Sequence, residues 1–153
     1  MSAINQLLTE VHWQNLDFLI IDMPPGTGDT QLTFAQDIKV DGSIIVSTPQ
    51  ELALMDVQRG IQMFDKTKIK ILGLVDNMSF FEGDDGKKYN IFGAGGVEKT
   101  AKQFDKKFLG QIPISTPLRE SADLGLPLTY KESDHEISKI FLEIAKKIMQ
   151  DVG

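Results

Sequence analysis

Four short apolar runs, separated by segments with helical spacing, constrain the fold of this chain more than any other feature. The runs are residues 18–21, 43–46, 69–75 and the weaker 108–112. Nearly continuous apolar runs of this length are typical of parallel strands that are covered on both faces. Their alternation with helical segments predicts an α/β fold, a parallel sheet flanked by helices. Ligands of such sheets bind beyond the carboxyl ends of the strands, so functional residues are expected there.

Capping signals predict where the intervening helices begin. Thr48 precedes Pro, Gln and Glu, which predicts an N-cap at Thr48. Ser133 opens the string Ser-Asp-His-Glu, a second capping box, and the apolar stripe of residues 137–148 that follows predicts a helix packed on the core. Two shorter helices are indicated by Thr116-Pro117 and by the spacing of Val97, Ala101 and Phe104.

Composition excludes several classes of function. The chain has 153 residues, 41% of them hydrophobic, which suits a single domain, and its net charge of -6 argues against nucleic acid as a partner. It has no apolar stretch of membrane-spanning length and no signal-peptide pattern, so no membrane partner and a cytoplasmic location are predicted. His12 and His135 lie far apart and are expected to be surface or helix-end residues. The absence of Cys excludes disulfides, thiolate zinc sites and clusters ligated by this chain's own sulfurs.

The most informative local string is residues 20–29, Ile-Ile-Asp-Met-Pro-Pro-Gly-Thr-Gly-Asp. A predicted buried strand ends in Asp22, and glycines follow whose backbone N–H groups can converge on an anion. A carboxylate beside such a nest suits a hydrated Mg²⁺ ion that bridges to nucleotide phosphates, as in a Walker B motif. The simpler alternative is a tight turn into a helix with Asp29 as its N-cap, but the whole string favours the phosphate interpretation.

Blocks along nearly the whole chain resemble the Mrp/ApbC family. These proteins are P-loop ATPases of the deviant-Walker type, related to MinD, and serve as iron–sulfur cluster carriers. The resemblance therefore implies a MinD/Mrp-like P-loop NTPase fold, ATP and Mg²⁺ as cofactors, a homodimer, and apoproteins that accept clusters. The blocks that carry the resemblance are residues 17–29, Thr48-Pro49-Gln50, Asn77-Met78-Ser79, residues 91–96, Ile112-Pro113 and residues 119–127.

The same resemblance implies roles for individual residues. Asp22 corresponds to the Walker B carboxylate, which holds Mg²⁺ through water. Asn77 corresponds to the Asn that contacts adenine, and an amide can both donate to and accept from a purine edge. Without the family, an Asn that ends a strand in a turn explains Asn77 equally well. The remaining implied residues are Gly26, Thr27 and Gly28 in the switch loop facing the γ-phosphate, and Pro113 and Arg119 near the base, with surface ion pairing as the default for Arg119.

The chain departs from the family at the phosphate-binding loop. A P-loop requires Gly-x4-Gly-Lys-[Ser/Thr], and the nearest string, residues 93–100, has Glu98 where the second Gly belongs. A carboxylate there repels phosphate, so this string is not expected to bind it. We therefore predict that residues 1–153 form one partial domain, the C-terminal part of a longer protein that begins at the helix before the Walker B strand. Alone, this chain is expected neither to bind ATP tightly nor to hydrolyse it.

The second departure is at the loop where the family usually carries Cys-x-x-Cys. Here residues 80–89 read Phe-Phe-Glu-Gly-Asp-Asp-Gly-Lys-Lys-Tyr, so no iron–sulfur ligand is present in this chain. Asp84 and Asp85 can attract a hard cation, although Gly-Asp-Asp-Gly is more typical of a polar turn. Cysteines elsewhere in a longer protein remain possible ligands.

Three hypotheses follow. In the first, the parent protein is an Mg²⁺-dependent ATPase of the Mrp type that carries iron–sulfur clusters. In the second, it is a MinD/ParA-like ATPase in which nucleotide controls partner binding and no cluster is held. In the third, this chain is an inactive truncated scaffold.

Overall fold

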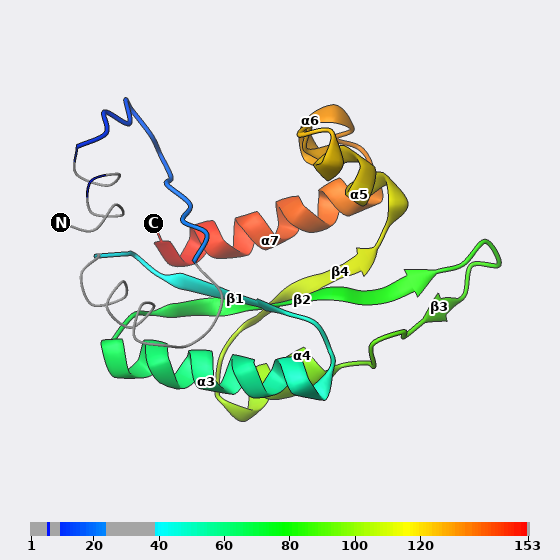
Figure 1. The fold of residues 1–153 in the computed structure, drawn as a ribbon, viewed down its shortest axis with the longest axis horizontal. Coiled ribbons are helices and arrows are strands. Elements are labelled where there is room, and N and C mark those ends of the chain that lie inside the picture. Colours follow the sequence, from blue (N-terminus) through cyan, green and yellow to red (C-terminus); the bar gives the residue numbers. More distant parts are fainter. Residues whose placement is uncertain (1–5, 7–9, 24–38, 153) are drawn as a thin grey trace. The chain divides into compact units, whose positions relative to one another are not determined.

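The computed structural model describes residue 6, residues 10–23 and residues 39–152, and it divides the chain into two compact units. The first unit comprises residues 1–39 and the second residues 40–153. Each unit is described by itself below. The second unit contains the sheet and its covering helices (Figure 1).

The second unit alternates strands and helices, as the sequence predicts. Its C-terminal half adds two short helices before the long last one. The elements in chain order are β1 (Ser43–Ser47), α3 (Glu51–Thr67), β2 (Ile71–Glu82), β3 (Lys88–Tyr89), α4 (Gly96–Gln103), β4 (Phe108–Ile114), α5 (Thr116–Asp123), α6 (Leu128–Lys131) and α7 (Glu136–Val152).

The sheet is parallel across its three main strands. β2 lies between β1 and β4, with Ser47 opposite Asp76 and Asn77 opposite Ile112. At its carboxyl end, β2 also pairs antiparallel with the short β3, which forms a hairpin arm (Figure 1). The three strands β1, β2 and β4 therefore place their carboxyl ends at one edge of the sheet.

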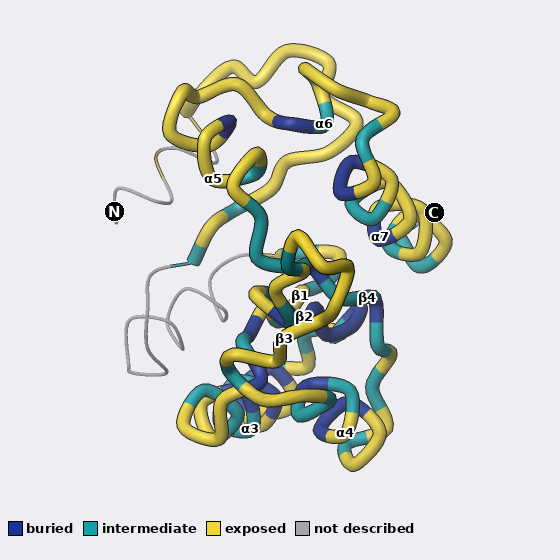
Figure 2. The backbone as a smooth tube through the Cα atoms, turned by 90° about the vertical axis from the view of Figure 1, so that its right-hand side faces the viewer, coloured by how far each residue is buried: buried dark blue, intermediate teal, exposed yellow. Residues whose placement is uncertain are grey.

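Helices cover the two faces of the sheet unequally. On one face, α3 packs on β1 and α4 packs on β2 and β4, around Leu74, Val97 and Ile61. On the other face, α7 packs mainly on β4, around Val75, Leu109 and Ile144 (Figure 1). Figure 2 shows the buried residues concentrated where these helices meet the strands. The apolar stripe of residues 137–148 is thus confirmed as core packing.

The prediction of strands is correct for three of the four apolar runs. Residues 43–46 and 108–112 lie in β1 and β4, and the run 69–75 lies in β2 from residue 71 onward, whereas residues 18–21 form no strand. Ile20 is 91% exposed, and no described residue of 10–23 takes part in a ladder. The prediction fails there because an apolar run becomes a buried strand only when neighbouring strands and helices cover it.

Two predicted helix caps are wrong by a few residues. α3 begins at Glu51, because Gln50 is extended (φ -63°, ψ 138°) and Pro49 biases Thr48 away from helical geometry. At α7, the imidazole Nδ1 of His135 accepts the Ile137 N–H at 3.1 Å, so His135 takes the place predicted for Ser133. α5 starts as predicted, with the hydroxyl of Ser115 accepting the Leu118 N–H at 3.3 Å.

Within the described residues, no helix combines the length and the hydropathy needed to cross a bilayer.

Candidate nucleotide-binding edge

The carboxyl edge of the sheet gathers polar residues from adjacent strands. β1 ends at Ser47, β2 carries Asp76 and Asn77 at the same level, and β4 carries Gln111 opposite Asp76. α3 follows the parallel strand β1, and α4 follows the hairpin of β2 and β3. Both helices therefore begin at this edge of the sheet. Neither helix has a side-chain N-cap, so their first N–H groups and their positive dipole ends remain available there.

Asn77 lies within β2 and not beyond its end, so the sequence prediction is corrected on this point. The parallel ladder reaches Asn77, and the register with β4 then shifts between Asn77 and Phe81. Met78 has a left-handed φ of 54°, and its N–H donates to Asn77 Oδ1 at 3.0 Å. β2 can continue because the buried Ser79 hydroxyl donates to the carbonyl of Ile112 at 3.1 Å. This irregularity leaves Asn77 half-buried, with its amide NH₂ free of any described hydrogen bond.

Pro113 lies one residue beyond the partner of Asn77. Because Asn77 pairs with Ile112, the register brings Asn77 and Pro113 together at the carboxyl edge, as expected for two residues that flank one ligand. Pro113 lacks an N–H donor, and β4 tolerates it because β4 has a described pairing partner, β2, on one side only.

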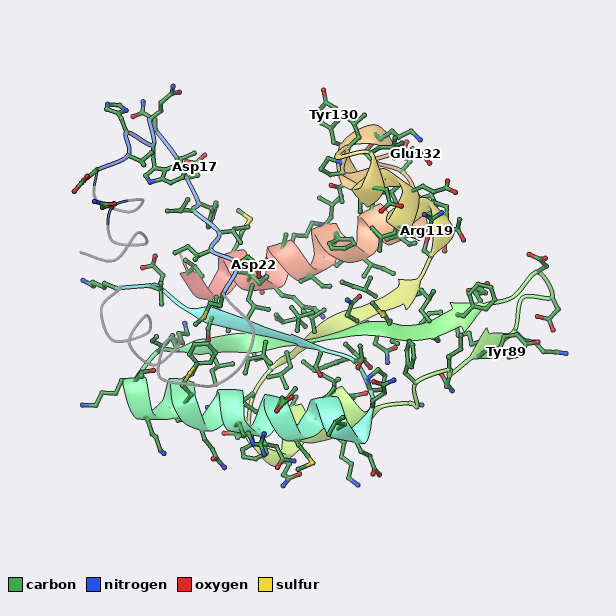
Figure 3. The ribbon with its side chains drawn as sticks, viewed as in Figure 1. Asp17, Asp22, Tyr89, Arg119, Tyr130 and Glu132 are labelled. Carbon is green, nitrogen blue, oxygen red and sulfur yellow. The ribbon has the colours of Figure 1, made fainter. Side chains whose placement is uncertain are left out.

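Arg119 lies on α5, which follows β4, and its guanidinium is engaged with carboxylates. It donates to Asp123 at 2.7 Å and to Glu120 at 3.2 Å, and all three side chains are exposed (Figure 3). The structure therefore shows the surface ion pairing that the sequence gives as the default for this residue.

Asp76 is a feature that the sequence analysis missed. Its side chain is 0% exposed, and neither carboxylate oxygen has a hydrogen-bond partner among the described residues. Burial raises the pKa of Asp76, and the nearby Gln111 side chain offsets part of that rise. A signal was present, since Asp76 is the one charged residue directly after the apolar run 71–75. Burying an unpaired carboxylate costs folding free energy. Because such residues cluster at functional sites, Asp76 marks this edge of the sheet as a candidate functional site.

The Walker B candidate, Asp22, lies in the first unit. Its side chain is exposed, and Figure 3 shows it on the same extended stretch as Asp17. The other switch-loop candidates, Gly26, Thr27 and Gly28, lie outside the described residues. No group of three His, Cys, Asp or Glu side chains in the described part of the chain is arranged to hold a metal. A single carboxylate fits an Mg²⁺ ion that arrives with nucleotide phosphates, since Mg²⁺ keeps several waters in such sites.

The string of residues 93–100 forms a turn at Gly93–Gly95 and then the first residues of α4. Gly93 and Gly95 have φ values of 99° and 68°, which favour glycine. A Cβ at Gly96 would lie 2.9 Å from the carbonyl oxygen of Pro49, so this glycine allows the loop before α4 to pack on the loop before α3. The Thr100 hydroxyl is buried and donates to the carbonyl of Gly96 at 2.9 Å.

The loop that replaces Cys-x-x-Cys is a closed hairpin. Gly86 N–H donates to the carbonyl of Gly83 at 2.9 Å, which confirms the predicted polar turn. The carboxylate of Asp85 accepts the Lys87 N–H at 3.0 Å and the Tyr89 hydroxyl at 3.1 Å, and it pairs with Lys87 Nζ at 3.2 Å. Hydrogen bonding, above all from the Lys87 N–H, lowers the pKa of Asp85. These hard and already engaged oxygen atoms do not fit an iron–sulfur cluster.

A parallel sheet with helix N-termini and polar side chains at its carboxyl edge defines an α/β protein of the nucleotide-binding kind. Comparison with known proteins makes the assignment specific. A family model described as ParA, NUBPL iron-transfer P-loop NTPase, matches residues 1–149. The chain belongs to this family.

Curated relatives extend the comparison along nearly the whole chain. The iron–sulfur cluster carrier protein of Haemophilus influenzae is 45% identical over 99% of this chain, which covers 41% of that protein. The iron–sulfur cluster transfer protein NUBPL of Mus musculus is 45% identical over 98% of the chain, which covers 47% of that protein. The chain thus spans less than half the length of these relatives.

Solved structures agree with the fold. A nucleotide-binding protein from Archaeoglobus fulgidus, solved in complex with ADP, is 40% identical with a TM-score of 0.74. That match covers 88% of this chain and 54% of the solved chain. The cell division ATPase MinD of Pyrococcus furiosus shares the fold at 21% identity, with a TM-score of 0.66 over 96% of this chain and 55% of the other. The predicted MinD/Mrp-like P-loop NTPase fold is confirmed.

Proposed function

We propose that the full-length protein is an ATP-binding and ATP-hydrolysing iron–sulfur cluster carrier of the Mrp type, and that this chain supplies its base-binding edge and its Walker B segment. The observation that carries the proposal is the adjacency of Asn77 and Pro113 at the carboxyl edge of β2 and β4. Relatives that are 45% identical and named cluster carrier or cluster transfer proteins support it. A cytoplasmic homodimer that serves apoprotein acceptors completes the proposal.

The edge offers a purine base two kinds of contact. The Asn77 NH₂ group donates to a ring nitrogen, while its Oδ1, which already accepts the Met78 N–H, is held in a fixed orientation. Pro113 offers a flat apolar surface next to it. The ADP bound to the Archaeoglobus fulgidus protein is consistent with an adenine nucleotide as the ligand.

The Walker B segment supplies charge and positioning. Asp22 is proposed to orient the water shell of Mg²⁺, and Gly26, Thr27 and Gly28 to approach the γ-phosphate with backbone N–H groups. Bound Mg²⁺ supplies charge neutralisation of the phosphates. Because no covalent step is needed for phosphoryl transfer to water, the residues of this chain contribute through position and charge.

The cluster is cargo that this chain cannot ligate with its own side chains. It has no Cys, and the hairpin that stands at the family's ligand loop has its Asp85 oxygens engaged. Thiolates from outside this chain are required for the carrier role. If none act, the MinD/ParA-like alternative applies, in which nucleotide controls partner binding, and the closed hairpin is the observation that favours it.

The proposal is tested on the full-length gene product purified without oxygen. Iron, acid-labile sulfide and ATP hydrolysis are measured for the native protein, for Asp22→Asn and for Asp17→Asn, a matched exposed carboxylate on the same stretch. We expect bound iron and sulfide, and ATP hydrolysis that is lost in Asp22→Asn and kept in Asp17→Asn.

The outcomes separate the hypotheses. ATP hydrolysis without iron or sulfide supports the nucleotide-gated alternative, and the absence of both supports the inactive scaffold. The 153-residue chain by itself is expected to show no tight binding of ATP by isothermal titration. Micromolar binding by that chain contradicts the proposal that the phosphate site depends on other segments.

A further inference from the structure

β2 carries more residues than its neighbour β4 where the two strands reach the carboxyl edge of the sheet. Asn77 pairs with Ile112, and the next pair along the ladder is Phe81 with Ile114. Residues 78–80 of β2 therefore lie opposite a single residue of β4. An insertion of this kind is a β-bulge, and bulges are common beside functional sites. We call residues 78–80 the edge bulge.

The backbone of Met78, the first residue of the edge bulge, has a conformation that its own side chain disfavours. Its φ is 54°, in the left-handed region, where the Cβ approaches the following carbonyl oxygen. Residues with a Cβ keep this conformation only where the surrounding structure imposes it, and such positions cluster at ligand-binding sites. The edge bulge therefore depends on contacts that hold it in place.

Two side-chain hydrogen bonds hold the edge bulge. Met78 N–H donates to Asn77 Oδ1 at 3.0 Å. The hydroxyl of Ser79 donates to the carbonyl of Ile112 at 3.1 Å. Ser79 is only 2% exposed, and its hydroxyl bonds the same residue with which Asn77 pairs in the ladder. Asn77 and Ser79 are thus both attached to Ile112, with Met78 between them.

This arrangement sets the orientation of the Asn77 amide. The backbone has to turn within one residue between two points that are both fixed to β4, and the left-handed Met78 makes that turn. The turn directs the Met78 N–H at the Asn77 side chain, where only the amide oxygen can accept it. The amide NH₂ is therefore the group that is left to donate to a ligand.

The same hydroxyl also holds Pro113. This residue directly follows Ile112 and has no N–H with which to pair in the ladder. The bond from Ser79 to the Ile112 carbonyl supplies a link between β2 and β4 at the point where Pro113 cannot donate one. One buried hydroxyl thus connects the two residues that are proposed to flank the base.

We propose that Ser79 is a positioning residue for the purine base: its hydroxyl fixes the edge bulge, and the bulge presents the Asn77 NH₂ group to a ring nitrogen of the base. The inference rests on the proposed function for the nucleotide and adds the residue that orients its base contact. Without the Ser79 hydroxyl, Met78 relaxes to a negative φ and its N–H leaves Asn77 Oδ1. The amide then rotates freely.

The test measures how strongly binding depends on single nitrogens of the base. The full-length gene product is titrated with ADP and with 1-deaza-, 3-deaza- and 7-deaza-ADP, in each of which C–H replaces one ring nitrogen. One analogue is expected to bind the native protein about two- to tenfold more weakly than ADP, because it lacks the acceptor for Asn77. In Ser79→Ala this ratio is expected to fall toward one, the value expected for Asn77→Ala.

Ser138→Ala is the matched control. The Ser138 hydroxyl is also buried and donates to a backbone carbonyl, that of Glu132 at 2.7 Å, but it lies on α7. Its loss is expected to lower folding stability as the loss of the Ser79 hydroxyl does, whereas the ratio of ADP to analogue binding stays at its native value. The ratio therefore separates a positioning role from a contribution to stability alone. Thermal unfolding verifies that both variants fold.

Two substitutions at Met78 test the backbone part of the inference. Met78→Gly is expected to keep the native ratio, because Gly adopts a positive φ without steric cost. Met78→Val is expected to reduce the ratio, since a β-branched residue fits a φ of 54° poorly. The Met78 side chain is 44% exposed, and equal loss of the ratio in both variants would assign the base contact to that side chain and overturn the inference.

Hydrogen exchange without nucleotide provides a readout that does not involve the base. In peptides that cover residues 77–80, exchange is expected to be faster in Ser79→Ala than in the native protein or in Ser138→Ala. Unchanged exchange in Ser79→Ala, or a native ratio in that variant, overturns the inference alone. If the native protein binds all three analogues as tightly as ADP, the base contact of the proposed function fails and the positioning role fails with it, so the two failures are distinct.

Discussion

Residues 18–21 and residues 71–75 are both nearly continuous apolar runs, yet they have opposite fates in the structure. Residues 71–75 lie in β2 between two parallel strands, and Leu74 there is fully buried. Residues 18–21 form no strand, and the side chains of residues 18–20 are exposed. The difference shows that an apolar run stabilises the fold only where other segments cover it. Two runs of similar composition therefore contribute differently to folding stability.

The largest expected effect compares the two runs directly. Leu74→Ala removes buried methyl groups from the cluster between β2, α3 and α4, and we expect a loss of about 2–5 kcal/mol in the free energy of unfolding. Ile20→Ala is the control and is expected to change it by less than about 0.5 kcal/mol, because Ile20 is exposed. Urea unfolding measures both. Equal losses of unfolding free energy in Leu74→Ala and Ile20→Ala would contradict the conclusion that burial decides what an apolar run contributes.

Asp76→Asn tests the carboxylate that directly follows the buried run 71–75. Removal of a buried, unpartnered charge is expected to raise stability at pH 7 by about 1–3 kcal/mol. Because burial raises the folded-state pKa of Asp76, the native protein loses stability as pH rises from the ordinary Asp pKa through the raised one. The gain from Asp76→Asn is therefore full above that window and absent at lower pH.

Unfolding measured from pH 3 to pH 8 tests this dependence, and Asp56→Asn on the exposed surface of α3 is the control. A gain that does not vary with pH would show that it does not come from the charge of Asp76, and no gain at pH 7 would show that this charge is compensated by groups beyond the described hydrogen bonds.

A smaller effect is expected at the helix caps. Ser115→Ala removes the acceptor for the Leu118 N–H and is expected to cost about 1 kcal/mol of unfolding free energy. Ser133→Ala is the matched control, since its sequence predicts a cap whereas His135 takes that place. A larger loss of unfolding free energy in Ser133→Ala than in Ser115→Ala would support Ser133 as the N-cap of α7, as the sequence predicts.

The smallest effect is local to the hairpin arm. Tyr89→Phe removes the hydroxyl that donates to Asp85, so the amide of Gly83, which donates to the Lys87 carbonyl, is expected to exchange faster with solvent. Hydrogen bonding lowers the pKa of Asp85. The stabilisation of the hairpin arm by ionised Asp85 is therefore fully present above the ordinary Asp pKa and is lost as pH falls through the lowered pKa. Hydrogen exchange measures the change, with Asp84→Asn as the control. Unchanged exchange at Gly83 would show that the β-turn alone holds the arm.

Much of the candidate site could be predicted from sequence because its residues follow apolar runs. The position of Asn77 after the run 69–75 predicted its place near the edge, but the left-handed Met78 and the register shift that keep β2 going were not evident. Pro113 was located by resemblance, and only the pairing of Asn77 with Ile112 showed that the two residues adjoin. Asp76 was missed because sequence does not reveal whether a carboxylate has partners.

The sequence by itself determined the alternation of strands and helices, the family, the lack of cysteine ligands and the turn at residues 83–86, since each depends on local pattern or residue chemistry. Tertiary structure alone decided which apolar runs became strands, that β2 lies between β1 and β4, and that the buried carboxylate of Asp76 has no hydrogen-bond partner among the described residues. These features depend on contacts between segments distant in sequence, and the burial of a side chain is a property of everything that packs around it.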